Sequence, residues 1–195
     1  MKKVLNVGGN SKAIPLSPQY EGWDHILLDI DPKGNPDVLC DARELITLPE
    51  SVYDSVYCSH NLEHYYHHDA KKVLAGFSHV LKEDGFVFII VPDMYAVMQT
   101  VIEKNMDIED VLYQSPAGSI KVRDVIYGYG VKIESSGCDF FAHKTGFTQK
   151  SLTEILDEAG FSWIFTGLDY LEIFAFAFKG EPNDHLTKLL NITKP

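Results

Sequence analysis

Residues 4–10 have the sequence VLNVGGN, an apolar run that stops at a pair of glycines. The run is too short for a helix, and glycines directly after such a run are typical of a tight loop that follows a buried β-strand. We therefore expect a first strand at residues 4–7. Gly8 and Gly9 carry no side chain, so the backbone at the carboxyl end of this strand can pass close to a ligand.

More short runs of β-forming residues follow before Pro92, at residues 26–30, 37–40, 53–58 and 85–91. Runs of this kind predict parallel strands that are buried on both faces of a sheet. Residues 69–81 instead repeat apolar side chains at helical spacing. Strands that alternate with crossover segments predict right-handed units and a doubly wound α/β fold.

The segment at residues 94–146 is longer than a simple connection. It holds helical patterns at 95–103 and 108–113, and then a glycine-bearing loop over residues 128–137. Long insertions at the working edge of such a sheet are usually lids or binding loops. We therefore expect a substrate-side insertion or lid at 94–146.

The C-terminal part predicts a helix and a strand pair. Residues 148–159 form an amphipathic pattern with Thr148 as a suitable N-cap and Gly160 directly after it. The runs at 161–166 and 170–178 predict an antiparallel hairpin at the edge of the sheet.

Composition and charge limit the possible partners. The chain has 195 residues, 45% hydrophobic and 23% charged, which fits a single globular domain over residues 1–195. Its 17 basic residues are scattered and outnumbered by 28 acidic ones, so nucleic acids and anionic membranes are poor partners. No apolar run approaches the roughly 20 residues of a membrane span, and no signal peptide is evident, so we expect a cytoplasmic protein.

Polar residues follow several of the expected strands. Ligands of open α/β sheets bind beyond the carboxyl ends of the strands, so these residues are the candidates for a site. Asp29, about 20 residues after the glycines, is placed to bind ribose hydroxyls. Asp41 follows the next strand, where a carboxylate can accept a hydrogen bond from an adenine amino group. Each signal is weak alone, but together they indicate a nucleoside-bearing cofactor.

Several short segments, spread along the chain, match the pattern of a known family. They are LNVG (5–8), LDIDP (28–32), CDA (40–42), SHNLEH (59–64), VLK (80–82), VPD (91–93), HKTGFT (143–148) and AGF (159–161). In this order and spacing they resemble the class I S-adenosylmethionine-dependent methyltransferases, specifically the short bacterial ones. The resemblance extends over nearly the whole chain apart from roughly residues 95–125 and the tail.

The resemblance implies a Rossmann-like fold, an enzyme and a cofactor. The fold would be a mainly parallel sheet of seven strands with an antiparallel C-terminal hairpin, and the cofactor would be S-adenosyl-L-methionine. The reaction would be in-line attack of an acceptor atom on the sulfonium methyl. The expected acceptor is a small molecule or a saccharide, a class suggested by the acidic composition and by related bacterial proteins.

The resemblance also implies which residues meet the cofactor. The first loop would pass its methionine part, Asp29 would hold the ribose, Asp41 and Ala42 would meet the adenine, and Ser59 and His60 would lie near the transferred methyl. The full implied set is Gly8, Gly9, Asn10, Asp29, Asp41, Ala42, Ser59 and His60.

Asn10 departs from the family pattern. The family usually has Gly-x-Gly in the first loop, and Asn10 replaces the second of these glycines. Asn adopts positive φ more readily than most residues, so we expect the turn to be kept. Its side chain lies where it can crowd the cofactor, which makes the affinity the property to test.

A general base is useful if the acceptor is a hydroxyl, because proton removal contributes about 10²–10⁴-fold to such reactions. His60, directly after an expected strand, and His143, at the end of the insertion, are the candidate catalytic residues. His143 and Lys144 can equally serve to anchor the insertion.

Other classes of function remain open. HNLEH, residues 60–64, matches an inverzincin zinc pattern, but His60 is expected in a turn and out of helical register with His64, so no metal is expected. An NAD-dependent oxidoreductase needs G-x-G-x-x-G, which residues 8–13 lack. A non-catalytic cofactor-binding or interaction protein of the same fold would also account for Asn10.

Overall fold

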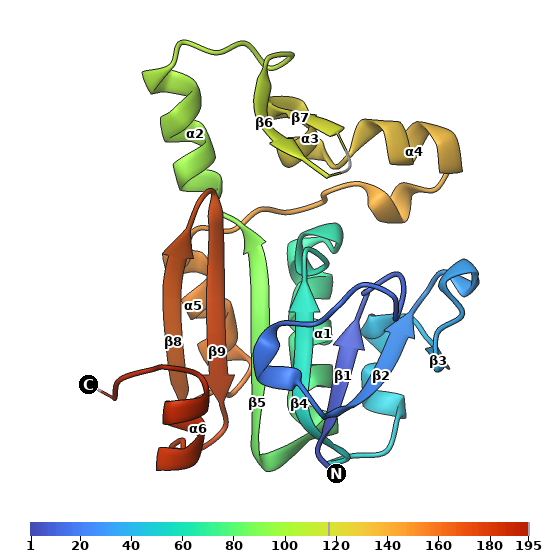
Figure 1. Cartoon of the computed structure of the whole chain (residues 1–195), viewed down its shortest axis with the longest axis vertical. Coiled ribbons are helices and arrows are strands. Elements are labelled where there is room, and N and C mark those ends of the chain that lie inside the picture. The colour runs from blue at the N-terminus through green and yellow to red at the C-terminus, as the bar shows by residue number, and fades with distance from the viewer. Residues whose placement is uncertain (117, 195) are drawn as a thin grey trace.

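A sheet of seven strands in the order β3-β2-β1-β4-β5-β9-β8 forms the centre of the protein (Figure 1). The structure is a computed structural model and describes residues 1–116 and 118–194. The first five strands are parallel, whereas β9 runs antiparallel to both β5 and β8. The strands are β1 (Lys3–Val7), β2 (Asp24–Asp29), β3 (Val38–Leu39), β4 (Tyr53–Ser59), β5 (Leu81–Pro92), β8 (Trp163–Asp169) and β9 (Glu172–Phe178).

These strands confirm the predicted α/β fold, the count of seven and the C-terminal hairpin. Strand β1 lies between β2 and β4, and its Val4 and Leu5 are fully buried. A strand with neighbours on both edges and cover on both faces buries most of its side chains, and in β1 Lys3 is the exposed one. This burial explains the apolar residues of β1.

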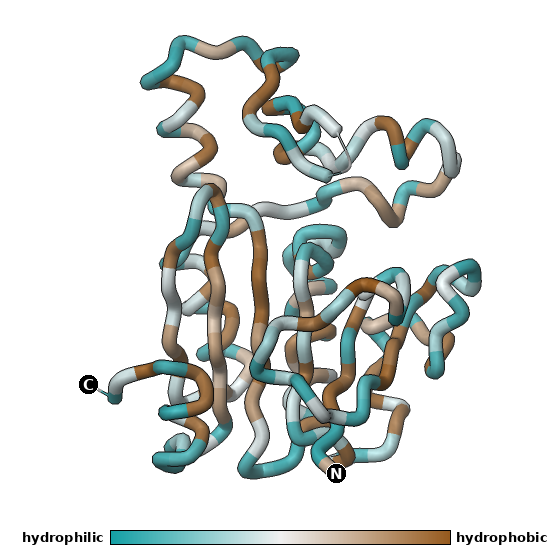
Figure 2. Tube along the Cα trace, viewed as in Figure 1, coloured by the Kyte–Doolittle hydropathy of each residue, from teal (hydrophilic) through white to brown (hydrophobic). Residues whose placement is uncertain are grey.

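The two faces of the sheet are covered differently. One face packs against α1 (His67–Val80) and α5 (Gln149–Glu158) in the larger hydrophobic cluster. The other face has an aromatic cluster that includes Tyr20 and Phe86, covered by the short α6 (Asp184–Leu189) and a 3-10 turn at Pro18–Tyr20. Figure 2 shows the apolar residues concentrated along the strands and on the helices behind them.

The helices are short. The longest, α1, has 14 residues, and its buried Val73, Leu74 and Phe77 lie on the face toward the sheet. Helix α5 begins after Thr148, whose side chain accepts a hydrogen bond from the Ser151 N–H, as the predicted N-cap requires. None of the helices in the described residues is long and apolar enough to cross a membrane.

The insertion lies beyond the carboxyl ends of the parallel strands (Figure 1). It comprises α2 (Met94–Glu103), β6 (Val111–Ser115), β7 (Gly118–Lys121), α3 (Val122–Tyr127) and α4 (Gly130–Ser136). It has a small core of its own, which includes Val97, Leu112 and Ile120.

Two expectations for the insertion are wrong. The predicted helical pattern at 108–113 is replaced by a turn at 108–110 and by the first residues of strand β6, because Val111 and Tyr113 pair with Lys121 and Ile120 of β7. A β-hairpin partner outweighs the weak helical preference of so short a segment. The predicted loop over 128–137 contains helix α4, which ends at Gly137 with a φ of +65°. That glycine is a helix C-cap rather than a loop residue.

Candidate cofactor cleft and side pocket

A cavity of about 650 Å³, called the main cleft below, opens at the carboxyl ends of β1, β2 and β4. The structure brings five of the predicted cofactor-binding residues to its wall, namely Gly8, Asn10, Asp29, Asp41 and His60. The other predicted residues, Gly9, Ala42 and Ser59, lie beside the cleft but are not in its wall. Asn61, Tyr65 and Lys144 also line the cleft and were not among the predicted cofactor-binding residues.

The first loop packs closely on two asparagine side chains. Gly8 has a φ of +71°, and a Cβ at this position would collide with the side chain of Asn61. A Cβ on Gly9 would collide with the side chain of Asn6. Asn10 has a φ of +59°, which confirms that it adopts the left-handed conformation expected of a glycine replacement. The loop therefore needs its glycines for packing within the protein as well as for access to a ligand.

Asp29 fixes this loop to β2. Its side chain is nearly buried, with 8% exposed. One carboxylate oxygen accepts a hydrogen bond from the Asn10 N–H at 2.9 Å, and the other accepts one from the Asp31 N–H at 2.9 Å. Each carboxylate oxygen has two lone pairs, so Asp29 can still accept from a ligand hydroxyl.

Asp41 is already engaged by Arg43. Its carboxylate accepts hydrogen bonds from the Arg43 backbone N–H at 2.9 Å and from the Arg43 Nε at 3.0 and 3.1 Å. The hydrogen bonds from Arg43 hold the pKa of Asp41 below its usual value, so the carboxylate is charged. A ligand amino group at Asp41 would share the carboxylate with Arg43.

His60 lies in the turn after β4, with a φ of +49°. Its ring nitrogens lie 3.2 Å from a Glu172 carboxylate oxygen and 3.7 Å from a Glu63 carboxylate oxygen. Burial favours the neutral ring, but the contacts with Glu172 and Glu63 outweigh it and raise the pKa of His60 to about 10. His60 is therefore an imidazolium cation at neutral pH, with no free lone pair.

Glu63 is a buried carboxylate that sequence reasoning did not assign to the site. It is 2% exposed, and neither of its oxygens has a hydrogen-bond partner among the described residues. Burial alone would raise its pKa, but the nearby His60, with His64 and His143, lowers the pKa of Glu63 overall. The sequence contains one signal for Glu63, the His-x-x-Glu-His spacing of residues 60–64, but this spacing was interpreted only as a metal-binding motif.

The end of the insertion is attached to the segment after β4. The Lys144 and Thr145 N–H groups donate to the Glu63 backbone carbonyl at 2.8 and 3.2 Å. A ring nitrogen of His64 lies 3.2 Å from the Ala142 carbonyl. The SHNLEH and HKTGFT segments, far apart in sequence, therefore form one unit.

His143 is half-buried at this junction. Its Nδ1 lies 2.8 Å from the Val125 carbonyl, which has no proton to give, so Nδ1 carries the proton and donates it. Burial lowers the pKa of His143, although Glu63 acts in the opposite direction. The ring is therefore neutral at pH 7, with its lone pair on Nε2, 4.0 Å from a Glu63 oxygen.

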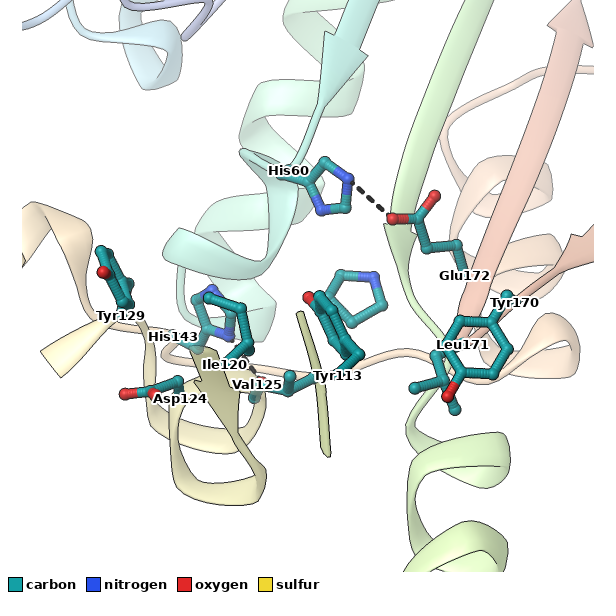
Figure 3. A pocket seen from close by; sticks show the side chains of 11 residues that line it. His60, Tyr113, Ile120, Asp124, Val125, Tyr129, His143, Tyr170, Leu171 and Glu172 are labelled. Atoms are coloured by element: carbon teal, nitrogen blue, oxygen red, sulfur yellow. Dashed lines mark hydrogen bonds and ion pairs between the residues drawn. The ribbon is translucent and has the colours of Figure 1, made fainter. Parts of the chain in front are cut away.

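Figure 3 shows the residues that line a second cavity of about 220 Å³, called the side pocket below. It adjoins the main cleft. His60 and Tyr129 line both cavities. The insertion forms one wall of the side pocket and the β8–β9 turn forms another. The lining residues are His60, Pro92, Tyr113, Ile120, Asp124, Val125, Tyr129, His143, Tyr170, Leu171 and Glu172.

The described part of the chain contains one group that could hold a metal ion, made of Glu63, His64 and His143. Their ligand atoms lie within 4.8 Å of one another. Tetrahedral zinc, with bonds of about 2.0–2.1 Å, brings its ligands to about 3.3 Å from each other. Both ring nitrogens of His64 also face backbone carbonyls, at 3.2 Å each. The Glu63 oxygen and the His143 Nε2 are 4.0 Å apart, so zinc would require these side chains to move closer together.

We therefore expect the purified protein to hold no stoichiometric zinc. Elemental analysis after dialysis against buffer without chelator checks this directly. Near-stoichiometric metal that disappears in His64→Ala or His143→Ala, but not in His68→Ala, would show that the cluster closes around an ion.

Comparisons with known proteins agree with this architecture. Residues 8–89 match the family described as methyltransferase domain. A SAM-dependent methyltransferase from Archaeoglobus fulgidus is 17% identical, with 90% of this chain and 85% of the other covered and a TM-score of 0.57. A Burkholderia thailandensis 1,6-didemethyltoxoflavin-N1-methyltransferase, solved with 1,6-didemethyltoxoflavin and S-adenosylhomocysteine, is 18% identical, with 92% and 72% covered and a TM-score of 0.55. No curated protein matches the chain significantly.

A SAM-dependent methyltransferase from Methanosarcina mazei is similar in the same way, at 14% identity, with 90% and 91% covered and a TM-score of 0.55. At such identities the solved structures define the fold and not the reaction. The fold is that of the class I S-adenosylmethionine-dependent methyltransferases. The match to the methyltransferase-domain family begins at Gly8 and includes the loops after β1, β2, β3 and β4. The resemblance stated from the sequence is therefore confirmed.

Proposed function

We propose that this protein is an S-adenosyl-L-methionine-dependent methyltransferase that acts on a small-molecule acceptor. The observation that carries the proposal is the main cleft of about 650 Å³ and the side pocket of about 220 Å³, which meet at His60 and Tyr129. The larger cavity has the size of a cofactor site and the smaller one can hold an acceptor. Group transfer would take place where they meet.

The side chains of the main cleft suit this cofactor. Asp29 offers carboxylate oxygens to the ribose hydroxyls. Asp31 adds negative charge that favours a positive sulfonium, and Lys132 and Lys144 provide cations for the amino-acid carboxylate. When bound, the cofactor supplies a methyl carbon activated by the adjacent sulfonium sulfur.

The protein contributes alignment, exclusion of water and proton transfer. We assign the two candidate catalytic histidines different roles, because they differ in charge. His60, a cation held by Glu172 and Glu63, positions the groups at the junction of the two cavities. His143, neutral with a free Nε2, is the general base for an acceptor that must lose a proton. The insertion at 94–146 supplies the outer wall of the acceptor site.

A calorimetric titration with S-adenosylhomocysteine and NAD tests the proposal. S-adenosylhomocysteine is expected to bind roughly tenfold or more tightly than NAD. Equal or tighter binding of NAD would overturn the cofactor assignment. Binding without turnover on any small-molecule or saccharide acceptor would favour a non-catalytic protein of the same fold.

A further inference from the structure

The side pocket has an unusual combination of aromatic and acidic walls. Tyr113, Tyr129 and Tyr170 contribute aromatic rings, and Asp124 and Glu172 contribute carboxylates (Figure 3). None of the residues that line it in the described part of the chain is lysine or arginine. His60 is the one lining side chain that carries positive charge at neutral pH.

The charges around the pocket do not cancel. The His60 cation lies between Glu172, at 3.2 Å, and the buried Glu63, at 3.7 Å, so it can offset only one of these two carboxylates. Asp124 adds a further negative charge, and its oxygens accept hydrogen bonds from the Lys121 and Gly130 backbone N–H groups. The pocket therefore has a net negative potential.

The pKa of Tyr113 agrees with this negative potential. Burial raises the pKa of its phenol, and the charges of Glu172 and Asp124 raise it further. Tyr113 and Tyr170 also form an edge-to-face pair, with ring centroids 6.4 Å apart. Aromatic rings of this kind attract a cation to their faces through the ring quadrupole.

We propose that the side pocket binds the acceptor as a small organic amine in its ammonium form, and that the amine nitrogen receives the methyl group. This inference rests on the proposed function and specifies its acceptor. Carboxylates and tyrosine rings together stabilise a desolvated ammonium, whereas a carboxylate or phosphate acceptor would be repelled by Glu172 and Asp124. The volume of about 220 Å³ limits the amine to roughly the size of a single ring with a short chain.

The protons and electrons of the step balance. An ammonium nitrogen has no lone pair, so it first gives one proton to Nε2 of His143, which lines the same pocket. The freed lone pair forms the bond between nitrogen and the methyl carbon while the bond between that carbon and the sulfonium sulfur breaks. The electron pair of the broken bond stays on sulfur. The product leaves as a methylated ammonium, and His143 returns its proton to solvent.

Calorimetry with matched probes tests the inference. Phenylethylamine, phenylethanol and phenylacetate share a ring and chain length but differ in charge, and shorter alkylamines extend the amine series. With S-adenosylhomocysteine present, at least one amine is expected to bind roughly tenfold or more tightly than its matched alcohol, and the acid is expected not to bind. Equal binding of acid and amine, or failure of every amine to bind, would overturn the inference.

Glu172→Gln is the informative variant, because Glu172 is partly exposed at the start of β9 and its side chain lines the pocket. It is expected to weaken amine binding by about tenfold and to leave alcohol binding unchanged. Glu154→Gln, an exposed residue of α5 outside both cavities, is the matched control. Titration of S-adenosylhomocysteine alone separates the two proposals: if it binds and no amine does, only the acceptor is wrong, and if it does not bind, the proposed function fails.

Discussion

Asp29→Ala is expected to weaken S-adenosylhomocysteine binding by roughly tenfold or more, which corresponds to about 1.4 kcal/mol. The variant loses two sets of hydrogen bonds, and both losses lower the affinity. The ribose hydroxyls lose a charged acceptor, and the Asn10 and Asp31 N–H groups lose the carboxylate that fixes the first loop to β2. Isothermal titration calorimetry of the variant and the parent measures the change.

Asn10→Gly tests the partner of Asp29 in this loop. It keeps the backbone N–H that donates to Asp29 and accepts the φ of +59° without strain. Affinity within a few-fold of the parent is therefore expected. A tenfold gain for Asn10→Gly would show that the natural loop is impaired, and unchanged affinity in Asp29→Ala, with thermal unfolding confirming a folded protein, would remove Asp29 from the ribose role.

The sheet could be predicted because its central strands are buried on both sides. Val4, Leu5 and Val56 have no exposed surface, and the short runs of β-forming residues around them locate their strands. The C-terminal hairpin could be predicted for the same reason, because Ile173, Ala175 and Ala177 of β9 are fully buried. A strongly buried strand can be recognised in the sequence without knowledge of the strands that pair with it.

The insertion could be predicted only in part. Helix α2 was recognised, because its apolar side chains repeat over ten residues. Strand β6 was not, because a short segment takes its structure from its partner, and the pairing of Tyr113 with Ile120 is not visible in either segment alone. Tertiary contacts decide the structure of such segments.

The candidate site was predictable where a residue directly follows a strand. Asp29, Asp41 and His60 were found in this way, since parallel strands end at the same edge of the sheet. Glu172 was missed because it begins a strand instead of ending one. Strand β9 is antiparallel, so its first residue lies opposite Pro92, the last residue of β5, at the same edge.

The charge states of the site could not be predicted from sequence. His60 and His143 were equivalent candidates for a base. Their difference arises from their surroundings, because His60 meets two carboxylates whereas His143 is half-buried and donates to the Val125 carbonyl. Such contacts join segments that lie far apart in the chain.

His143→Asn is expected to lower kcat for an acceptor amine by about 10²–10⁴-fold, the contribution of a well-placed general base. The asparagine amide is chosen because it can still donate to the Val125 carbonyl, so the fold and the affinity for S-adenosylhomocysteine should change little. His185→Ala, on the exposed side of α6, is the control and should retain the parental rate. Steady-state kinetics over a range of pH gives the measurement.

The pH dependence distinguishes a base from a structural residue. Burial lowers the pKa of His143 from its usual value of 6.5, and only the neutral ring accepts a proton. The parental rate should therefore fall as the pH drops through a pKa below 6.5, and this acid limb should be absent in His143→Asn. NMR titration of the ring protons gives an independent readout without an acceptor, with His143 titrating below 6.5 and His60 near 10. If His143→Asn keeps its rate and its acid limb, His143 serves only to anchor the insertion.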